Sequence, residues 1–125
     1  MPTILIIEDN CDIRENLKEC LELEGYHTCI AANGKNAIAL LDETIPDLII
    51  CDIMMPEMDG HEVLRITRKK ISTAAIPFIF STSKSERKDL TDAYAMGADE
   101  FITKPYDPDM LIKKIEELIG STGKK

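Results

Sequence analysis

Six side chains with reactive or ligating groups each follow a short apolar run in this sequence. Glu8 and Asp9 follow the first run, and Asp52 follows the third. Thr82 and Ser83 follow the fourth run and Lys104 follows the fifth. Such runs are typical of strands buried in a parallel sheet, and the carboxyl ends of those strands lie at one edge. We therefore expect three carboxylates, the two hydroxyls of Thr82 and Ser83, and an ammonium group to converge there.

These residue types predict phosphoryl chemistry. Three neighbouring carboxylates repel one another unless a cation is bound or some of them are protonated. Oxygen ligands of this kind suit Mg²⁺, which takes one or two carboxylates together with waters and a phosphate oxygen. Lys104 would hold an incoming phosphoryl group, Thr82 would donate a hydrogen bond to it, and Asp52 would be the nucleophile. The alternative interpretation makes Glu8 and Asp9 helix N-terminal charges and Thr82 a helix cap.

The elements that would position these groups alternate along the chain. The expected strands are residues 3–7, 27–32, 47–51, 76–80 and 100–103. The expected helices are residues 11–24, 34–45, 60–70, 85–96 and 107–119, with residues 120–125 as a frayed tail. This alternation predicts one α/β domain over residues 1–125, with a parallel sheet covered by helices on both faces. The weaker apolar pattern of residues 27–32 predicts an edge strand.

Composition excludes several classes of protein. The 125 residues are 44% apolar, so they can form a core without a disulfide or a metal. The net charge is −8, which argues against binding to nucleic acid, and no apolar run is long enough to span a bilayer. The acids are concentrated in residues 1–62, with 14 acids against 3 bases. Because the first residues lack a secretory signal, we expect a cytoplasmic protein.

The cysteines and histidines do not predict a metal site of their own. The four cysteines have neither a C-x-x-C pair nor zinc-like spacing, so we interpret them as reduced thiols that pack like small apolar residues. His61 stands alone in the expected third helix. We expect it to be an exposed helix residue rather than a ligand.

Five motifs, each at the end of or just after an expected strand, resemble the receiver domain of two-component response regulators, and in length the chain is similar to the single-domain chemotaxis type. The resemblance runs from Ile4 to about Ile119. It implies a flavodoxin-like fold with five parallel strands in the order 2-1-3-4-5. The motifs are Ile7-Glu8-Asp9-Asn10, Cys51-Asp52-Ile53-Met54-Met55-Pro56, Met58-Asp59-Gly60, Phe80-Ser81-Thr82-Ser83 and Phe101-Ile102-Thr103-Lys104-Pro105.

The resemblance implies a role for each acid of the expected site. Asp52 would be phosphorylated by a phosphohistidine on a partner kinase. Asp9 and Asp52 would ligate Mg²⁺ through their carboxylates, and Met54 would ligate it through its backbone carbonyl. Glu8 would act on the waters of the metal ion. The domain would catalyse its own phosphorylation and dephosphorylation without being an enzyme with a turnover substrate.

The resemblance also implies a switch. Lys104 would contact the phosphoryl group, Thr82 would move toward it, and Phe101 would turn inward as Thr82 moves. Two features depart from the family. Ser83 stands where the family most often has Ala or Gly. Met54 and Lys84 provide no amide or acid to orient water, so we expect a longer phosphoryl lifetime than in a variant with Asn and Glu there.

The partners implied are a sensor histidine kinase or phosphotransfer protein and a downstream protein target. The kinase would bind near Ile13 and Leu17, and the target would bind the surface of helix 4, strand 5 and helix 5. We expect no direct DNA binding and no membrane contact, with a monomer or a phosphorylation-dependent dimer. A receiver excised from a longer protein would have the same sequence features.

Two rival classes lack their required residues. A phosphatase of the haloacid-dehalogenase type also uses an aspartyl-phosphate, but it needs a second Asp two residues after the nucleophile, where this chain has Met54. A nucleotide-binding module needs a glycine-rich loop after the first strand, which is missing here.

Overall fold

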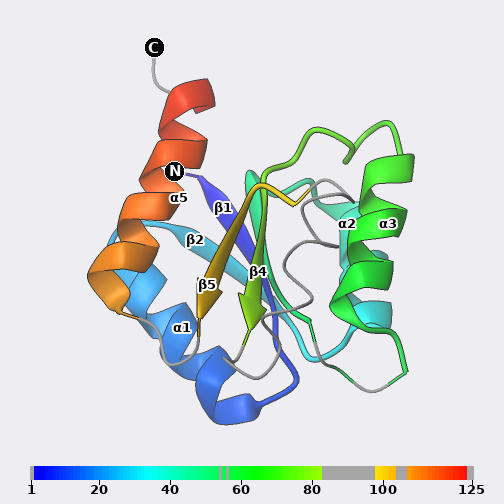
Figure 1. Ribbon diagram of the computed structural model, residues 1–125, viewed down its shortest axis with the longest axis horizontal. Helices are drawn as coiled ribbons and strands as arrows, with labels where there is room; N and C mark the ends of the chain where they lie inside the picture. Colours follow the sequence, from blue (N-terminus) through cyan, green and yellow to red (C-terminus); the bar gives the residue numbers. More distant parts are fainter. Residues whose placement is uncertain (1, 54, 56, 83–97, 104–106, 124–125) are drawn as a thin grey trace.

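The computed structural model describes residues 2–53, 55, 57–82, 98–103 and 107–123, and for residues 82 and 120–123 it describes the backbone alone. Strands and helices alternate as the sequence predicts (Figure 1). The strands are β1 (Thr3–Ile7), β2 (His27–Ala31), β3 (Leu48–Asp52), β4 (Phe78–Thr82) and β5 (Glu100–Thr103). The described helices are α1 (Cys11–Leu23), α2 (Gly34–Glu43), α3 (Gly60–Lys69) and α5 (Pro108–Gly123).

The five strands form one parallel sheet in the order β2-β1-β3-β4-β5. This confirms the expected order and the edge position of β2. Ile7 pairs with Cys51, and Asp52 pairs with Ser81. The carboxyl ends of β1, β3 and β4 therefore lie side by side, which is where an open α/β sheet binds its ligands.

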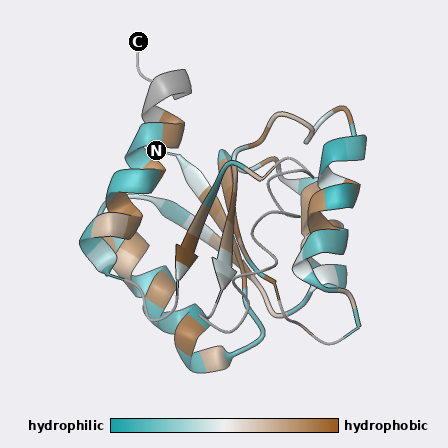
Figure 2. Cartoon of the chain, viewed as in Figure 1, coloured by the Kyte–Doolittle hydropathy of each residue, from teal (hydrophilic) through white to brown (hydrophobic). Residues whose placement is uncertain are grey.

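Successive side chains along each strand point to opposite faces of the sheet and so contribute to two separate hydrophobic cores. On one face, Leu5, Ile49 and Phe80 belong to a cluster with residues of α2 and α3. On the other face, Ile4 and Ile50 pack with residues of α1 and α5. Figure 1 shows these two helix pairs on opposite sides of the sheet, and Figure 2 shows predominantly hydrophobic strands between helices of mixed hydropathy. Burial on both faces explains why the central strands β1 and β3 are apolar over most of their length.

Three of the helices begin at a polar residue whose side chain accepts a hydrogen bond from the first turn. Asn10 accepts from the amide of Ile13 at 3.0 Å before α1, and Asn33 accepts in the same way before α2. Asp59 caps α3 through the amide of Glu62 at 3.0 Å. Because capping fixes where each helix starts, it also fixes the length of the loop between strand and helix.

The bounds of the described elements lie within two residues of the sequence prediction, apart from the end of the last helix. β4 starts at Phe78 rather than Ile76, because the Ile76 amide donates to the carbonyl of Thr73 in the preceding turn and Pro77 has no amide hydrogen. The last helix continues to Gly123, four residues past its expected end at residue 119. Glycine is a poor helix former, but it does not block helical hydrogen bonding. The expected helix 85–96 lies outside the described residues.

The inner face of α1 also differs from expectation. Leu17 is 3% exposed and packs in the core against the sheet, because it lies on the same helix face as Leu21. It is therefore not available on the surface predicted to face a kinase, whereas Glu15 and Glu19 are exposed on the same helix. Among the described residues, no helix is long and apolar enough to cross a bilayer.

Candidate functional site

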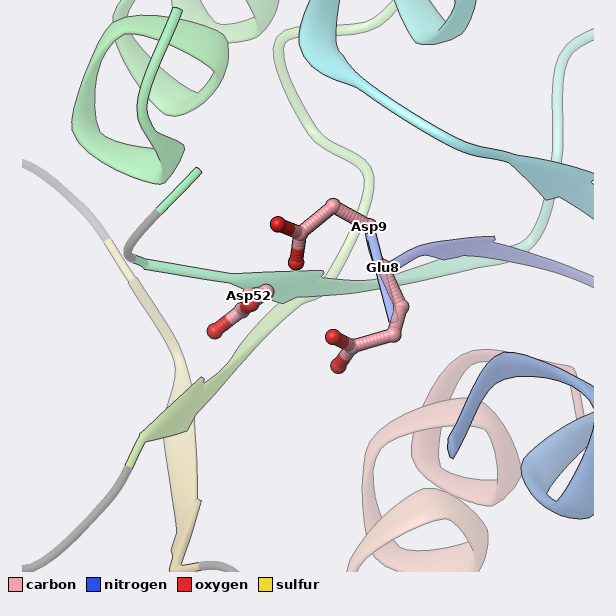
Figure 3. A group of neighbouring side chains, drawn as sticks. All are labelled: Glu8, Asp9 and Asp52. Carbon is pink, nitrogen blue, oxygen red and sulfur yellow. The ribbon is translucent and has the colours of Figure 1, made fainter. Parts of the chain in front are cut away.

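The three predicted carboxylates meet at the carboxyl ends of β1 and β3. One carboxylate oxygen from each of Glu8, Asp9 and Asp52 lies within 4.8 Å of the other two. Figure 3 shows the three side chains converging from these neighbouring strands. The pairing of Ile7 with Cys51 is the cause, because it places the residues that follow each of them side by side at the same edge of the sheet.

The three acids differ in exposure. Glu8 is 2% exposed and Asp52 is 5% exposed, whereas Asp9 is exposed. Glu8 is held in position because its amide donates to the carbonyl of Ala31 at 3.1 Å and its Oε2 accepts from the amide of Asn10 at 3.2 Å. The site therefore has two buried carboxylates, of which Glu8 is held by a backbone amide, and one carboxylate that faces solvent.

Charge repulsion at this spacing favours a bound cation. Two ionised carboxylates 4.8 Å apart repel by about 3 kcal/mol at an effective dielectric constant of roughly 20. Hard carboxylate oxygens are the donors that Mg²⁺ prefers. Two oxygens bound to the same octahedral Mg²⁺ lie at most about 4.2 Å apart. The carboxylates would therefore move slightly closer together around the ion, or one of them would bind it through a water molecule. The donor set therefore fits the predicted magnesium site.

The start of α3 lies directly against the backbone of Asp52. A Cβ atom at Gly60 would stand 2.4 Å from the carbonyl oxygen of Asp52 and 2.9 Å from Cε1 of Phe80, so only glycine fits here. The Gly60 amide donates to the carbonyl of Ile53 at 2.8 Å, which closes the loop after β3. Gly60 belongs to one of the sequence motifs, but the sequence did not predict this contact, because the contact depends on how α3 packs on β3.

A second close contact positions the same loop from α2. A Cβ atom at Gly34 would stand 2.8 Å from Sδ of Met58. Met58 is partly buried and packs against the core cluster beneath α2 and α3. The loop after Asp52 is thus packed against both helices of this face through Gly60 and Met58.

Phe101 is buried rather than exposed. Its ring is 9% exposed and stacks on Phe80, with 6.1 Å between ring centroids and 28° between ring planes. Phe80 also meets Phe78 edge-on at 5.2 Å. Phe101 is therefore part of an aromatic cluster of the α2 and α3 face.

His61 differs from its expected position at the surface. Its ring packs edge-on against Phe80, with 5.4 Å between centroids and 79° between planes. Its Nε2 is buried and, among the described residues, has no hydrogen-bond partner. The cause is the start of α3 at Gly60, which directs the next side chain toward β4. His61 is not part of the acidic cluster.

The remaining predicted site residues are described in part or not at all. Thr82 ends β4 and pairs with Thr103, the last residue of β5, so its backbone lies at the same edge of the sheet as Asp52. Its side chain is not described. Met54 and Lys104 lie outside the described residues, as do Ser83 and Lys84. Their predicted roles stay predictions.

A parallel 2-1-3-4-5 sheet with an acidic cluster at the ends of β1 and β3 defines a class of protein, the receiver domains of two-component signalling. Comparison with known proteins agrees with this class. The family model of the response regulator receiver domain matches residues 4–116. The chain belongs to this family, as its motifs predict.

Individual relatives support the same assignment. The chain is 37% identical over 120 residues to the response regulator SaeR of Staphylococcus aureus strain USA300, covering 95% of this chain and 51% of the relative. It thus spans about half the length of the curated relatives it matches. The signal receiver domain of a histidine kinase from Syntrophus aciditrophicus is 38% identical with a TM-score of 0.92, covering 100% of this chain and 95% of that one.

A chemotaxis protein is also among the similar structures. CheY4 of Vibrio cholerae is 28% identical with a TM-score of 0.89, covering 94% of this chain and 98% of that one. The fold is therefore shared with both chemotaxis proteins and kinase-linked receivers.

Proposed function

We propose that this domain accepts a phosphoryl group on Asp52 from a phosphohistidine, with Mg²⁺ held directly by Asp9 and Asp52 and by Glu8 through water. The observation that supports the proposal is the convergence of three carboxylates, with oxygens within 4.8 Å, around a nucleophile that is only 5% exposed. Mg²⁺ would neutralise charge on the carboxylates and on the phosphoryl oxygens. Met54 would add its carbonyl as a ligand.

The transfer step forms one bond and breaks one. A carboxylate oxygen of Asp52 attacks phosphorus while the phosphorus–nitrogen bond of the phosphohistidine breaks. The electron pair leaves with the imidazole nitrogen, which then takes a proton. The product is an acyl phosphate, and attack of water on its phosphorus restores the carboxylate and releases inorganic phosphate. Turnover of a separate substrate forms no part of this proposal.

Each residue of the site has a defined task. The Glu8 carboxylate, fixed by the amide of Asn10, orients water around the metal. Lys104 binds the phosphoryl oxygens, and Thr82 donates a hydrogen bond to one of them. Phosphorylation replaces the −1 charge of the Asp52 carboxylate with a phosphoryl group of roughly −1.5 to −2 charges and three acceptor oxygens, and this local change would bias a two-state element nearby. We assign that element to Thr82 and Phe101.

The output surface would include β5 and α5. A groove of about 420 Å³ lies there, lined by Phe101, Ile102, Thr103, Asp107, Met110, Leu111 and Lys114. Met110 is 57% exposed, and Lys114 pairs with Glu100 at 2.9 Å. We propose that a downstream protein binds here, and that residues 85–96, which the sequence predicts to be a helix, contribute to the same surface. The phosphoryl donor, a histidine kinase or phosphotransfer protein, would approach the exposed acids of α1.

Acetyl phosphate labelling tests the phosphoacceptor proposal without a partner protein. The native chain is expected to take up about one phosphoryl group per molecule when Mg²⁺ is present and none when it is chelated. Asp52→Asn is expected to remove the label. Glu43→Gln, which changes an exposed acid at the end of α2, is the matched control and should label normally. Equal labelling of Asp52→Asn and native protein would overturn the proposal.

A further inference from the structure

His61 connects the start of α3 with the ring on which Phe101 stacks. Gly60, the preceding residue, contacts the backbone of Asp52. The His61 ring meets the edge of Phe80 at 5.4 Å, and Phe80 stacks on Phe101 at 6.1 Å. A continuous series of packed groups thus runs from the acceptor aspartate to Phe101.

The histidine contributes its ring rather than a hydrogen bond to this series. Its Nε2 is buried without a partner among the described residues. A buried polar atom that makes no hydrogen bond destabilises the fold, so its polarity does not explain the residue's place in the structure. An edge-on aromatic contact, in contrast, restricts the orientation of Phe80, which is fully buried.

We infer that His61 is a positioning residue for Phe101, acting through Phe80. This inference rests on the proposed function, because it assigns Phe101 to the switch. By holding the Phe80 ring, His61 favours the buried, stacked arrangement of Phe101. Its position in the first turn of α3 allows displacement of the loop after Asp52 to reach Phe101 through packing.

Fluorine NMR on the full chain tests this inference, because the sequence has only three phenylalanines. In protein labelled with 4-fluorophenylalanine, the solvent isotope shift of the Phe101 signal reports how much of its ring is exposed. His61→Ala is expected to raise the ratio of exposed to buried Phe101 roughly two- to twelvefold. This change in population corresponds to the loss of the free energy of one aromatic pair. His61→Phe should bring the ratio back to within about twofold of native.

Two further variants distinguish positioning from a general loss of structure. His61→Leu keeps apolar bulk and removes the unpartnered nitrogen, so it is expected to fold and still to raise the exposure of Phe101. Arg65→Ala, at an exposed position one turn along α3, should leave Phe101 unchanged. An unchanged Phe101 signal in both His61→Ala and His61→Leu, or no recovery in folded His61→Phe, would overturn the inference.

The labelling of Asp52 separates this inference from the proposed function. All His61 variants are expected to take up the native amount of phosphoryl group from acetyl phosphate. Native protein that takes up none would refute the phosphoacceptor role itself, whatever the Phe101 signal shows. A normal label with an unchanged Phe101 signal would refute the positioning role alone.

Discussion

Replacing Gly60 with alanine is expected to damage the acceptor site through packing alone. The added Cβ would stand 2.4 Å from the carbonyl oxygen of Asp52 and 2.9 Å from Cα of Ile53, whereas ordinary contacts begin at 3.4 Å. The start of α3 and the end of β3 must therefore separate by about 1 Å, since neither group is a flexible side chain.

The magnitude follows from this displacement. Overpacking typically destabilises a protein by about 1–3 kcal/mol, and the better helix propensity of alanine offsets up to about 1 kcal/mol of this. We expect the free energy of unfolding to fall by about 1–2 kcal/mol. Misplacing a reacting group by about 1 Å costs around 10²-fold in rate, so phosphorylation by acetyl phosphate should slow by about a hundredfold.

Gly34→Ala is the matched control for this experiment. Its Cβ would also collide, but only with side-chain atoms of Met58: Sδ at 2.8 Å, Cγ at 2.9 Å and Cβ at 3.0 Å. Rotation of the flexible Met58 side chain moves Sδ and Cγ away, and a shift of a few tenths of an ångström accommodates Cβ, so labelling should stay within about twofold of native. Urea unfolding and the initial labelling rate at saturating Mg²⁺ measure both effects. A native labelling rate in folded Gly60→Ala would refute the reasoning.

Three more changes have defined outcomes. Asp9→Asn removes one of three repelling charges, so it should raise Tm without Mg²⁺ and reduce the stabilisation that MgCl₂ adds; an Mg²⁺ effect equal to native would contradict this. The Thr28 hydroxyl, which donates to Glu22 at 2.9 Å, lowers the pKa of Glu22, so Thr28→Val should raise it in an NMR titration. A lowered pKa in the folded protein contributes stability that is lost as the pH falls through that pKa. The difference in the free energy of unfolding between native protein and Thr28→Val should therefore shrink on acidification. A constant difference would argue against the hydrogen bond. Met54→Asn combined with Lys84→Glu should shorten the lifetime of the phosphoryl group, and decay that is equal or faster in native protein would exclude the proposed role of these positions.

The fold and the acidic cluster were predictable because local patterns determine both. A strand buried on two faces must be apolar throughout, and the carboxyl ends of parallel strands lie at one edge. Asp52 and the Glu8-Asp9 pair follow such strands, so their convergence depends on topology alone. The exact start of β4 was not predictable, because the apolar run beginning at Ile76 does not show where sheet hydrogen bonding starts.

Contacts between distant segments were not predictable from local patterns. In the sequence, a basic residue in the last turn of a helix, such as Arg68 in α3, predicts only a favourable interaction with the helix dipole. In the structure its guanidinium donates to the carbonyl of Ile76 at 2.6 Å and to Asp99 at 3.0 Å. Asp99 in turn accepts from the amide of Phe78 at 2.8 Å, so this ion pair ties α3 to the starts of β4 and β5. The contact of His61 with Phe80 was not predicted for the same reason, because it joins α3 to β4 and a single histidine forms no repeating pattern in the sequence.

Locating the phosphoryl group tests the central claim most directly. After labelling with acetyl phosphate and Mg²⁺, borohydride reduces an aspartyl phosphate to homoserine, which peptide mass spectrometry identifies by position. The account predicts homoserine at position 52 and at no other aspartate, with none formed when Mg²⁺ is chelated. Homoserine at another aspartate with position 52 unmodified would contradict it.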